Sequence, residues 1–118
     1  MTAAEIATLL RAARFQFSSE DDLQRGIDGL LKSRGLTVQR EVVLGPHDRI
    51  DFLLDGGIGI EVKVRGNASD LGRQVERYME NPRVSTVIVV TSRMTHQMLP
   101  ETISEKPVLV VHLMASMF

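Results

Sequence analysis

The 118-residue chain contains no cysteine, so it can form neither disulfide bonds nor thiolate metal sites, and a reducing, intracellular setting fits this composition. It also carries a net charge of only −1 at pH 7, which gives no overall attraction to nucleic acid. No basic leader followed by an apolar run opens the sequence, and no later run is long enough to cross a membrane. We therefore expect a cytoplasmic protein without a signal peptide or a membrane span.

The composition is that of an ordinary globular protein. Hydrophobic residues make up 43% of the chain and charged residues 25%, and the length suits one domain, residues 1–118, with one core. The charges are unevenly distributed, because residues 62–93 carry six basic side chains against three acidic ones. This region could bind phosphates, or it could be a solvated surface of mixed charge.

Apolar residues recur at helical spacing in three segments, and polar residues that commonly cap helices precede two of them. The predicted helices cover Thr2 to Phe15, then a stretch from Ser18 or Ser19 to a C-terminal Gly35, and a third stretch from Asn67 or Ser69 to about Glu80.

Runs rich in β-branched residues, separated by turn residues, predict five strands. They span residues 36–44, 49–54, 58–64, 84–91 and 107–113, and residues 95–103 allow a short helical turn. The run at 84–91 is continuous, as in a strand buried on both faces. The order α-α-β-β-β-α-β-(α)-β predicts an α/β domain with a mixed β-sheet flanked by helices.

The second and third strands form a hairpin, IDFLLDGGIGIEVKV, whose aliphatic run is interrupted by charged residues. Side chains alternate along a strand, so the aliphatic sets of the two strands stack on one face. On the opposite face we expect Asp51, Glu61 and Lys63 to lie together. The predicted aliphatic face consists of Ile50, Phe52, Leu54, Ile60, Val62 and Val64.

Two neighbouring carboxylates raise each other's pKa, and a divalent cation relieves their repulsion. Mg²⁺ prefers a few carboxylates together with water and phosphate oxygens. Lys63 could orient an attacking water or stabilise negative charge on a phosphate. Metal-assisted phosphodiester hydrolysis uses this set of groups. The alternative is a solvent-facing strand with a Glu–Lys pair.

Three helical residues could join this polar face. Gln74 lies on the apolar stripe of the third helix, four residues before Tyr78, and Glu20 lies one turn before the stripe of the second. Each also has an ordinary interpretation, since Gln74 could be a boundary residue and Glu20 could favour the helix dipole. The histidines at 47, 96 and 112 have no spacing typical of metal ligands.

In this order and spacing, Asp51 followed by Glu61-Val62-Lys63 resembles the signature of the PD-(D/E)XK nuclease superfamily. Gln74 and Tyr78 resemble the Q-x-x-x-Y motif of its RecB-like branches, and Holliday junction resolvases carry a helical glutamate like Glu20. The resemblance covers about residues 18–91 and implies a restriction-endonuclease-like core. The chain departs from the pattern at position 50, where an isoleucine replaces the motif's proline.

The resemblance assigns roles to individual residues. Asp51 and Glu61 would bind Mg²⁺ or Mn²⁺, with the Val62 carbonyl and Glu20 as further ligands, and Lys63 would position the nucleophilic water. Gln74 and Tyr78 would support the site and touch the DNA backbone. Around it, the expected phosphate contacts are Arg65, Arg73 and Arg77.

The expected function is therefore that of a Mg²⁺-dependent endo- or exodeoxyribonuclease that hydrolyses phosphodiester bonds in DNA, with structure-selective cleavage as one form of this activity. The small size leaves recognition to loops, a homodimer or a partner protein. Such an enzyme could serve DNA repair, recombination, restriction or phage packaging. The alternative is a non-catalytic DNA-binding or protein-interaction module with the same fold.

Overall fold

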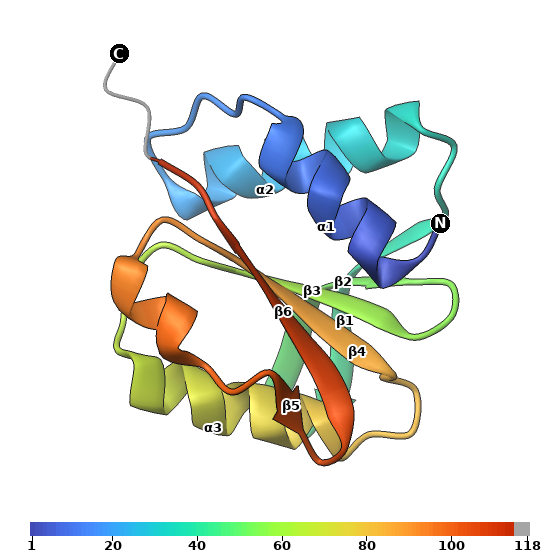
Figure 1. Cartoon of the computed structure of the whole chain (residues 1–118). Coiled ribbons are helices and arrows are strands. Elements are labelled where there is room, and N and C mark those ends of the chain that lie inside the picture. The colour runs from blue at the N-terminus through green and yellow to red at the C-terminus, as the bar shows by residue number, and fades with distance from the viewer. Residues whose placement is uncertain (115–118) are drawn as a thin grey trace.

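The computed structural model describes residues 1–114 (Figure 1). In chain order its elements are α1 (Ala3–Ala12), α2 (Glu20–Ser33), β1 (Val38–Gly45), β2 (Asp48–Leu54), β3 (Ile58–Lys63), α3 (Ala68–Met79), β4 (Thr86–Thr91), the 3₁₀ helix η1 (Met94–Met98), β5 (Thr102–Ile103) and β6 (Lys106–His112). This order confirms the predicted succession of helices and strands, and β5 is an addition that the sequence pattern did not predict.

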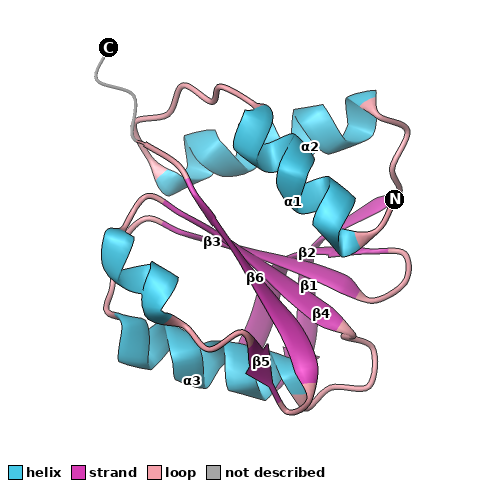
Figure 2. Cartoon of the chain, viewed as in Figure 1, coloured by secondary structure: helices cyan, strands magenta, loops and turns pink. Residues whose placement is uncertain are grey.

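The strands form one six-stranded sheet in the order β1-β2-β3-β4-β6-β5. Strands β1, β2 and β3 pair antiparallel, β3, β4 and β6 pair parallel, and β5 closes the edge as an antiparallel partner of β6. Helices α1 and α2 cover one face of the sheet, while α3 and η1 lie on the other (Figure 2). The predicted α/β architecture with a mixed sheet flanked by helices is thus confirmed.

Local capping signals fix the ends of the helices. Ser19 and Asn67 are the N-caps of α2 and α3, and each side-chain oxygen accepts a hydrogen bond from the backbone three residues further on. Gly35, with a φ of +76°, follows the end of α2 as predicted. Helix α1 is shorter than expected and ends before Phe15, because the chain becomes extended at Ala13. None of the helices in the described part of the chain has the length and apolar surface needed to cross a membrane.

The core consists of two apolar layers, one on each face of the sheet. The first lies under α1 and α2 and includes Ile6, Leu10, Leu23, Ile27, Phe52, Leu54, Ile60, Val62, Ile88 and Val90. The second lies under α3 and includes Ile50, Leu53, Leu71, Val75, Tyr78, Val87 and Val89. Strand β4 contributes to both layers and all six of its residues are buried, which confirms the prediction of a strand covered on both faces.

Strand β2 changes the face on which its side chains lie at Asp51. Phe52 belongs to the layer under α1 and α2, whereas Ile50 belongs to the layer under α3, where it leaves no room for a Cβ on Gly59. The predicted alternation, which put Ile50 and Phe52 on one face, is therefore wrong. On the neighbouring strand β1, Arg40 pairs with Phe52 and Val42 with Ile50. Between them Glu41 has a φ of +51°, so the backbone of β1 is irregular at the same point.

A tight hairpin joins β5 to β6 at the edge of the sheet. Ile103 pairs with Lys106, so only Ser104 and Glu105 form the turn. Both have positive φ, 53° and 63°, as a type I′ turn requires. The short helical turn expected in residues 95–103 begins slightly earlier, as η1, and the rest of that segment forms β5.

Candidate active site

The centre of the site is the point where β2 and β3 part. Their backbone pairing ends at Phe52 and Ile60, and side chains replace it at the next position. The Val62 N–H donates a hydrogen bond of 2.8 Å to Oδ2 of Asp51, and the Asp51 N–H donates one of 3.2 Å to Oε1 of Glu61. Each carboxylate is thus held by the backbone of the opposite strand.

This reciprocal arrangement follows from the change of face in β2. The Asp51 side chain reaches across to β3 and accepts the hydrogen bond of the Val62 N–H, whereas Glu61 lies between Ile60 and Val62, whose side chains belong to the layer under α1 and α2. The two carboxylates therefore meet as the sequence predicts.

The environment of the pair favours retention of a proton. Burial, together with the negative charge of Asp51, raises the pKa of Glu61 to about 8. Burial also raises the pKa of Asp51, against the opposing hydrogen bond from the Val62 N–H, and the charge of Glu20 adds to the increase. Near neutral pH the pair will therefore hold a proton or attract a cation.

Lys63 is the basic residue beside the pair. Its Nζ lies 3.9 Å from Oε2 of Glu61, and its side chain is 32% exposed. This distance is at the long end for an ion pair, so the ammonium group can also interact with a ligand on its open side. The predicted proximity of Glu61 and Lys63 is thereby confirmed.

The two residues on α3 differ in how they meet this site. Tyr78 is completely buried, and its hydroxyl donates a hydrogen bond of 3.1 Å to the Arg49 carbonyl. Burial and the nearby Glu61 carboxylate raise the Tyr78 pKa, so the phenol stays neutral. Gln74 is only half-buried on the same helix.

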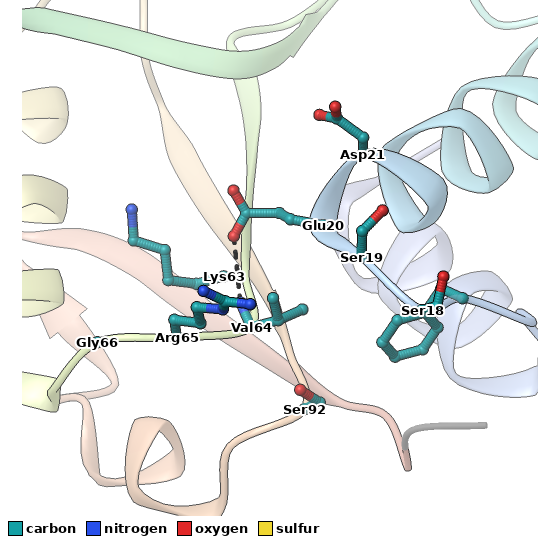
Figure 3. A pocket seen from close by; sticks show the side chains of 10 residues that line it. Ser18, Ser19, Glu20, Asp21, Lys63, Val64, Arg65, Gly66 and Ser92 are labelled. Atoms are coloured by element: carbon teal, nitrogen blue, oxygen red, sulfur yellow. Dashed lines mark hydrogen bonds between the residues drawn. The ribbon is translucent and has the colours of Figure 1, made fainter. Parts of the chain in front are cut away.

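Glu20 approaches the same end of β3 from the first turn of α2. Its side chain is half-buried, and Oε1 accepts a hydrogen bond of 3.2 Å from the Val64 N–H (Figure 3). The separation of 44 positions along the chain shows that α2 is docked directly on the end of the strand. The sequence-based expectation that Glu20 lies near the carboxylate pair is consistent with its effect on the Asp51 pKa.

The side chains of these residues supply some, but not all, of the ligands that a hard divalent cation needs. Asp51 and Glu61 each have one oxygen outside the backbone hydrogen bonds, and carboxylate oxygens are the ligands that Mg²⁺ and Mn²⁺ prefer. Within residues 1–114, however, no three acidic or histidine side chains are grouped so that they could hold a metal ion together. The residues therefore fit a site with two carboxylates in which water or substrate oxygens complete the coordination.

The three arginines predicted to surround the site are all exposed, but two of them are already paired. Arg73 forms an ion pair with Asp70, and Nε of Arg77 lies 2.7 Å from Oδ1 of Asp48. Arg65 forms no ion pair within the described residues and lines a cleft beside Lys63. Of the three, Arg65 is thus the one without an acidic partner among the described residues.

That cleft has a volume of about 780 Å³ and lies between the start of α2, the end of β3 and the segment after β4 (Figure 3). Glu20 and Lys63 line it together with Arg65, so it opens directly onto the candidate site. Phe17 and Ser92 also line it. Sequence analysis missed these two residues, because nothing in their local pattern shows that α2 docks at the end of β3.

His96 is a further residue whose role the sequence did not reveal. It is completely buried, with Nδ1 2.6 Å from the Thr91 hydroxyl and Nε2 2.9 Å from the Gly66 carbonyl. These contacts join the end of β4 to the loop between β3 and α3, which forms one wall of the cleft. His96 therefore supports the cleft and is not a metal ligand in this arrangement.

Comparison with known proteins gives no match: no family model, no curated protein and no solved structure is significantly similar to the chain. The geometry of the site and the chemistry of its residues are therefore the grounds for a functional proposal.

Proposed function

We propose that the chain is a metal-dependent nuclease with a restriction-endonuclease-like core, and that it hydrolyses phosphodiester bonds in DNA with Mg²⁺ or Mn²⁺. The observation that carries this proposal is the carboxylate pair of Asp51 and Glu61, fixed by the backbone of opposite strands and largely buried beside Lys63. Buried like charges are costly unless a proton or a cation compensates them, so a purely structural role explains this pair poorly.

The topology supports the same proposal. Three antiparallel strands lead into α3, and the chain then returns as β4, parallel to β3. The carboxylates lie where β2 and β3 separate, so they are fixed by strands and not by a loop. A site built on strands holds its groups with the precision that catalysis requires.

Each residue then has a defined part in the reaction. A bound divalent cation would supply Lewis-acid stabilisation of the phosphate and lower the pKa of a water molecule. Asp51 and Glu61 would hold the cation, and Lys63 would orient the water or stabilise charge on the phosphate. Glu20 would hold a further water, while Tyr78 keeps the α3 side of the site in place through its bond to Arg49.

The decisive experiment is a cleavage assay on labelled single-stranded, duplex, flap and four-way-junction DNA with Mg²⁺ or Mn²⁺. We expect Asp51→Asn and Glu61→Gln to lower the cleavage rate of the preferred substrate by about 10²-fold or more. Asp55→Asn is the matched control, since Asp55 is exposed in the turn between the same two strands. Equal losses in Asp51→Asn and Asp55→Asn, or no cleavage of any substrate by the parent, would contradict the proposal.

Calorimetry with Mn²⁺ tests metal binding without DNA. The parent should show one main site, which Asp51→Asn and Glu61→Gln each weaken severely and Asp55→Asn leaves unchanged. A parent chain that binds DNA but neither Mn²⁺ nor Mg²⁺ would instead be a non-catalytic module. The lack of a three-ligand group within residues 1–114 is the observation that favours this second candidate.

A further inference from the structure

The cleft beside the carboxylate pair has the size of a ligand site. Its volume of about 780 Å³ lies within the range of about 300–1,000 Å³ that is usual for pockets that bind small ligands. Lys63 lines the cleft and also lies 3.9 Å from Glu61, so the cleft and the candidate catalytic site share a wall. A phosphate placed at the carboxylate pair would therefore have its attached nucleoside beside or inside the cleft.

The lining of the cleft suits a nucleotide. Phe17 is half-buried against the core layer under α1 and α2, and the remainder of its ring lines the cleft together with Val64. Arg65 and the Ser92 hydroxyl add a cation and a hydrogen-bonding group on the same cavity. An aromatic ring next to a basic group is the arrangement with which proteins bind single strands, since bases stack on the ring while the cation contacts the backbone.

The charges around the site favour contact with a few phosphates over contact with a long stretch of the DNA backbone. Proteins that bind duplex DNA through its backbone typically neutralise several phosphates with Lys and Arg, roughly 6–10 in well-studied cases. Here Arg73 and Arg77 are paired with acidic partners, and in the cleft Lys63 and Arg65 face the acidic Glu20 and Asp21. The basic side chains beside the candidate site thus have acidic neighbours that offset much of their charge, which favours contact with few phosphates.

From these observations we infer that the cleft binds an unpaired nucleotide next to the scissile phosphate, so that the substrate is single-stranded DNA or a frayed strand end and not the interior of a duplex. The inference rests on the proposed nuclease function. A paired base is stacked on both sides and cannot enter a cleft of this kind without being extruded, which costs free energy. An unpaired base enters without that cost and gains stacking on Phe17.

Binding can be separated from cleavage by using Ca²⁺ in place of Mg²⁺ and measuring fluorescence anisotropy. The probes are a short labelled single strand of mixed sequence and a blunt hairpin duplex of the same composition. The parent should bind the single strand more tightly than the duplex. Phe17→Ala should weaken single-strand binding by about 5- to 150-fold, the loss expected for one stacked base, and Phe17→Tyr should bind like the parent.

Phe15→Ala is the matched control, because Phe15 is also half-buried against the same core layer but does not line the cleft. Its single-strand binding should remain close to that of the parent. If Phe17→Ala does not fold, Ser92→Leu narrows the cleft from the opposite side and should weaken single-strand binding instead. The inference is overturned if the parent binds the duplex as tightly as the single strand, or more tightly. It is also overturned if Phe17→Ala, or Ser92→Leu where Phe17→Ala does not fold, binds the single strand like the parent.

The outcomes also distinguish this inference from the proposed function. Cleavage of duplex and single strand at equal rates, with no effect of Phe17→Ala, would leave the nuclease function standing and overturn the inference. Absence of cleavage on every DNA form would contradict the nuclease function, and the inference, which depends on that function, would fall with it. Selective cleavage of single strands that is lost in Phe17→Ala would support both.

Discussion

The buried carboxylate of Glu61 should make the protein less stable as the pH rises. The residue is only 3% exposed, and burial together with the charge of Asp51 raises its pKa from the ordinary 4.5 to about 8. In the unfolded chain Glu61 loses its proton near pH 4.5, whereas in the folded protein it keeps the proton to about pH 8. The folded state therefore binds more protons throughout this interval.

The sign and the size of the effect follow from linkage. Where the folded state binds more protons, the free energy of unfolding falls as the pH rises, by at most about 1.4 kcal/mol per pH unit for one group. The contribution is fully present below pH 4.5 and is lost as the pH rises through about 8. Across the whole interval the loss amounts to about 5 kcal/mol, comparable with the total stability of many domains of this size.

Urea unfolding followed by far-ultraviolet circular dichroism between pH 5 and pH 8.5 measures this loss. The parent should lose several kcal/mol across this range, and Glu61→Gln should flatten the dependence and be more stable than the parent at the alkaline end. Glu76→Gln is the control, since Glu76 is exposed on α3. A parent whose stability is constant or rises with pH would refute the reasoning, as would equal flattening in the control.

Three further predictions concern Glu41, the turn between β5 and β6, and Lys63. Glu41→Val should lower the free energy of unfolding by about 1–3 kcal/mol, because a β-branched residue fits a left-handed backbone poorly, and it should speed hydrogen exchange of the Val62 amide. The control is Ser104→Val, which is also at positive φ but should leave exchange of the Val62 amide unchanged. Replacing Ser104 and Glu105 by Asn and Gly should stabilise the protein by about 1 kcal/mol in urea unfolding, since this pair suits a type I′ turn. Lys63→Ala should fold normally, with an unchanged urea midpoint, but cleave DNA about 10²-fold more slowly; parental cleavage rates would make Lys63 an ordinary surface residue.

The elements that sequence analysis predicted correctly depend on local signals. Ser19 and Asn67 cap helices through contacts three residues away, and Gly35 ends a helix through its own backbone conformation. The continuous β-branched run of β4 likewise reflects burial of that strand alone. Because such signals lie within a few residues of the feature they specify, the sequence shows them directly.

What the sequence did not reveal depends on contacts between distant segments. Ile50 lies on the face opposite that of Phe52 at the point where Glu41 of the neighbouring strand has a left-handed backbone, and an exposed glutamate gives no sign of that conformation. The ion pair of Arg77 with Asp48 joins α3 to β2, although the two residues are 29 positions apart in the sequence. It gives an acidic partner to an arginine that the sequence predicted to contact DNA phosphates. The burial of His96 likewise depends on Gly66, 30 positions away.

The position of β4 has a consequence for how the chain avoids aggregation. Its six residues, TVIVVT, are uncharged, rich in β-branched residues and paired on both edges, by β3 and by β6. During synthesis β6 emerges after β4, so one edge of an apolar strand is open for a time, and such segments can pair with other chains. Arg83 and Arg93 flank the strand, and charges in these places act as gatekeepers that oppose stacking between molecules. Both arginines would thus protect the protein most before it has finished folding.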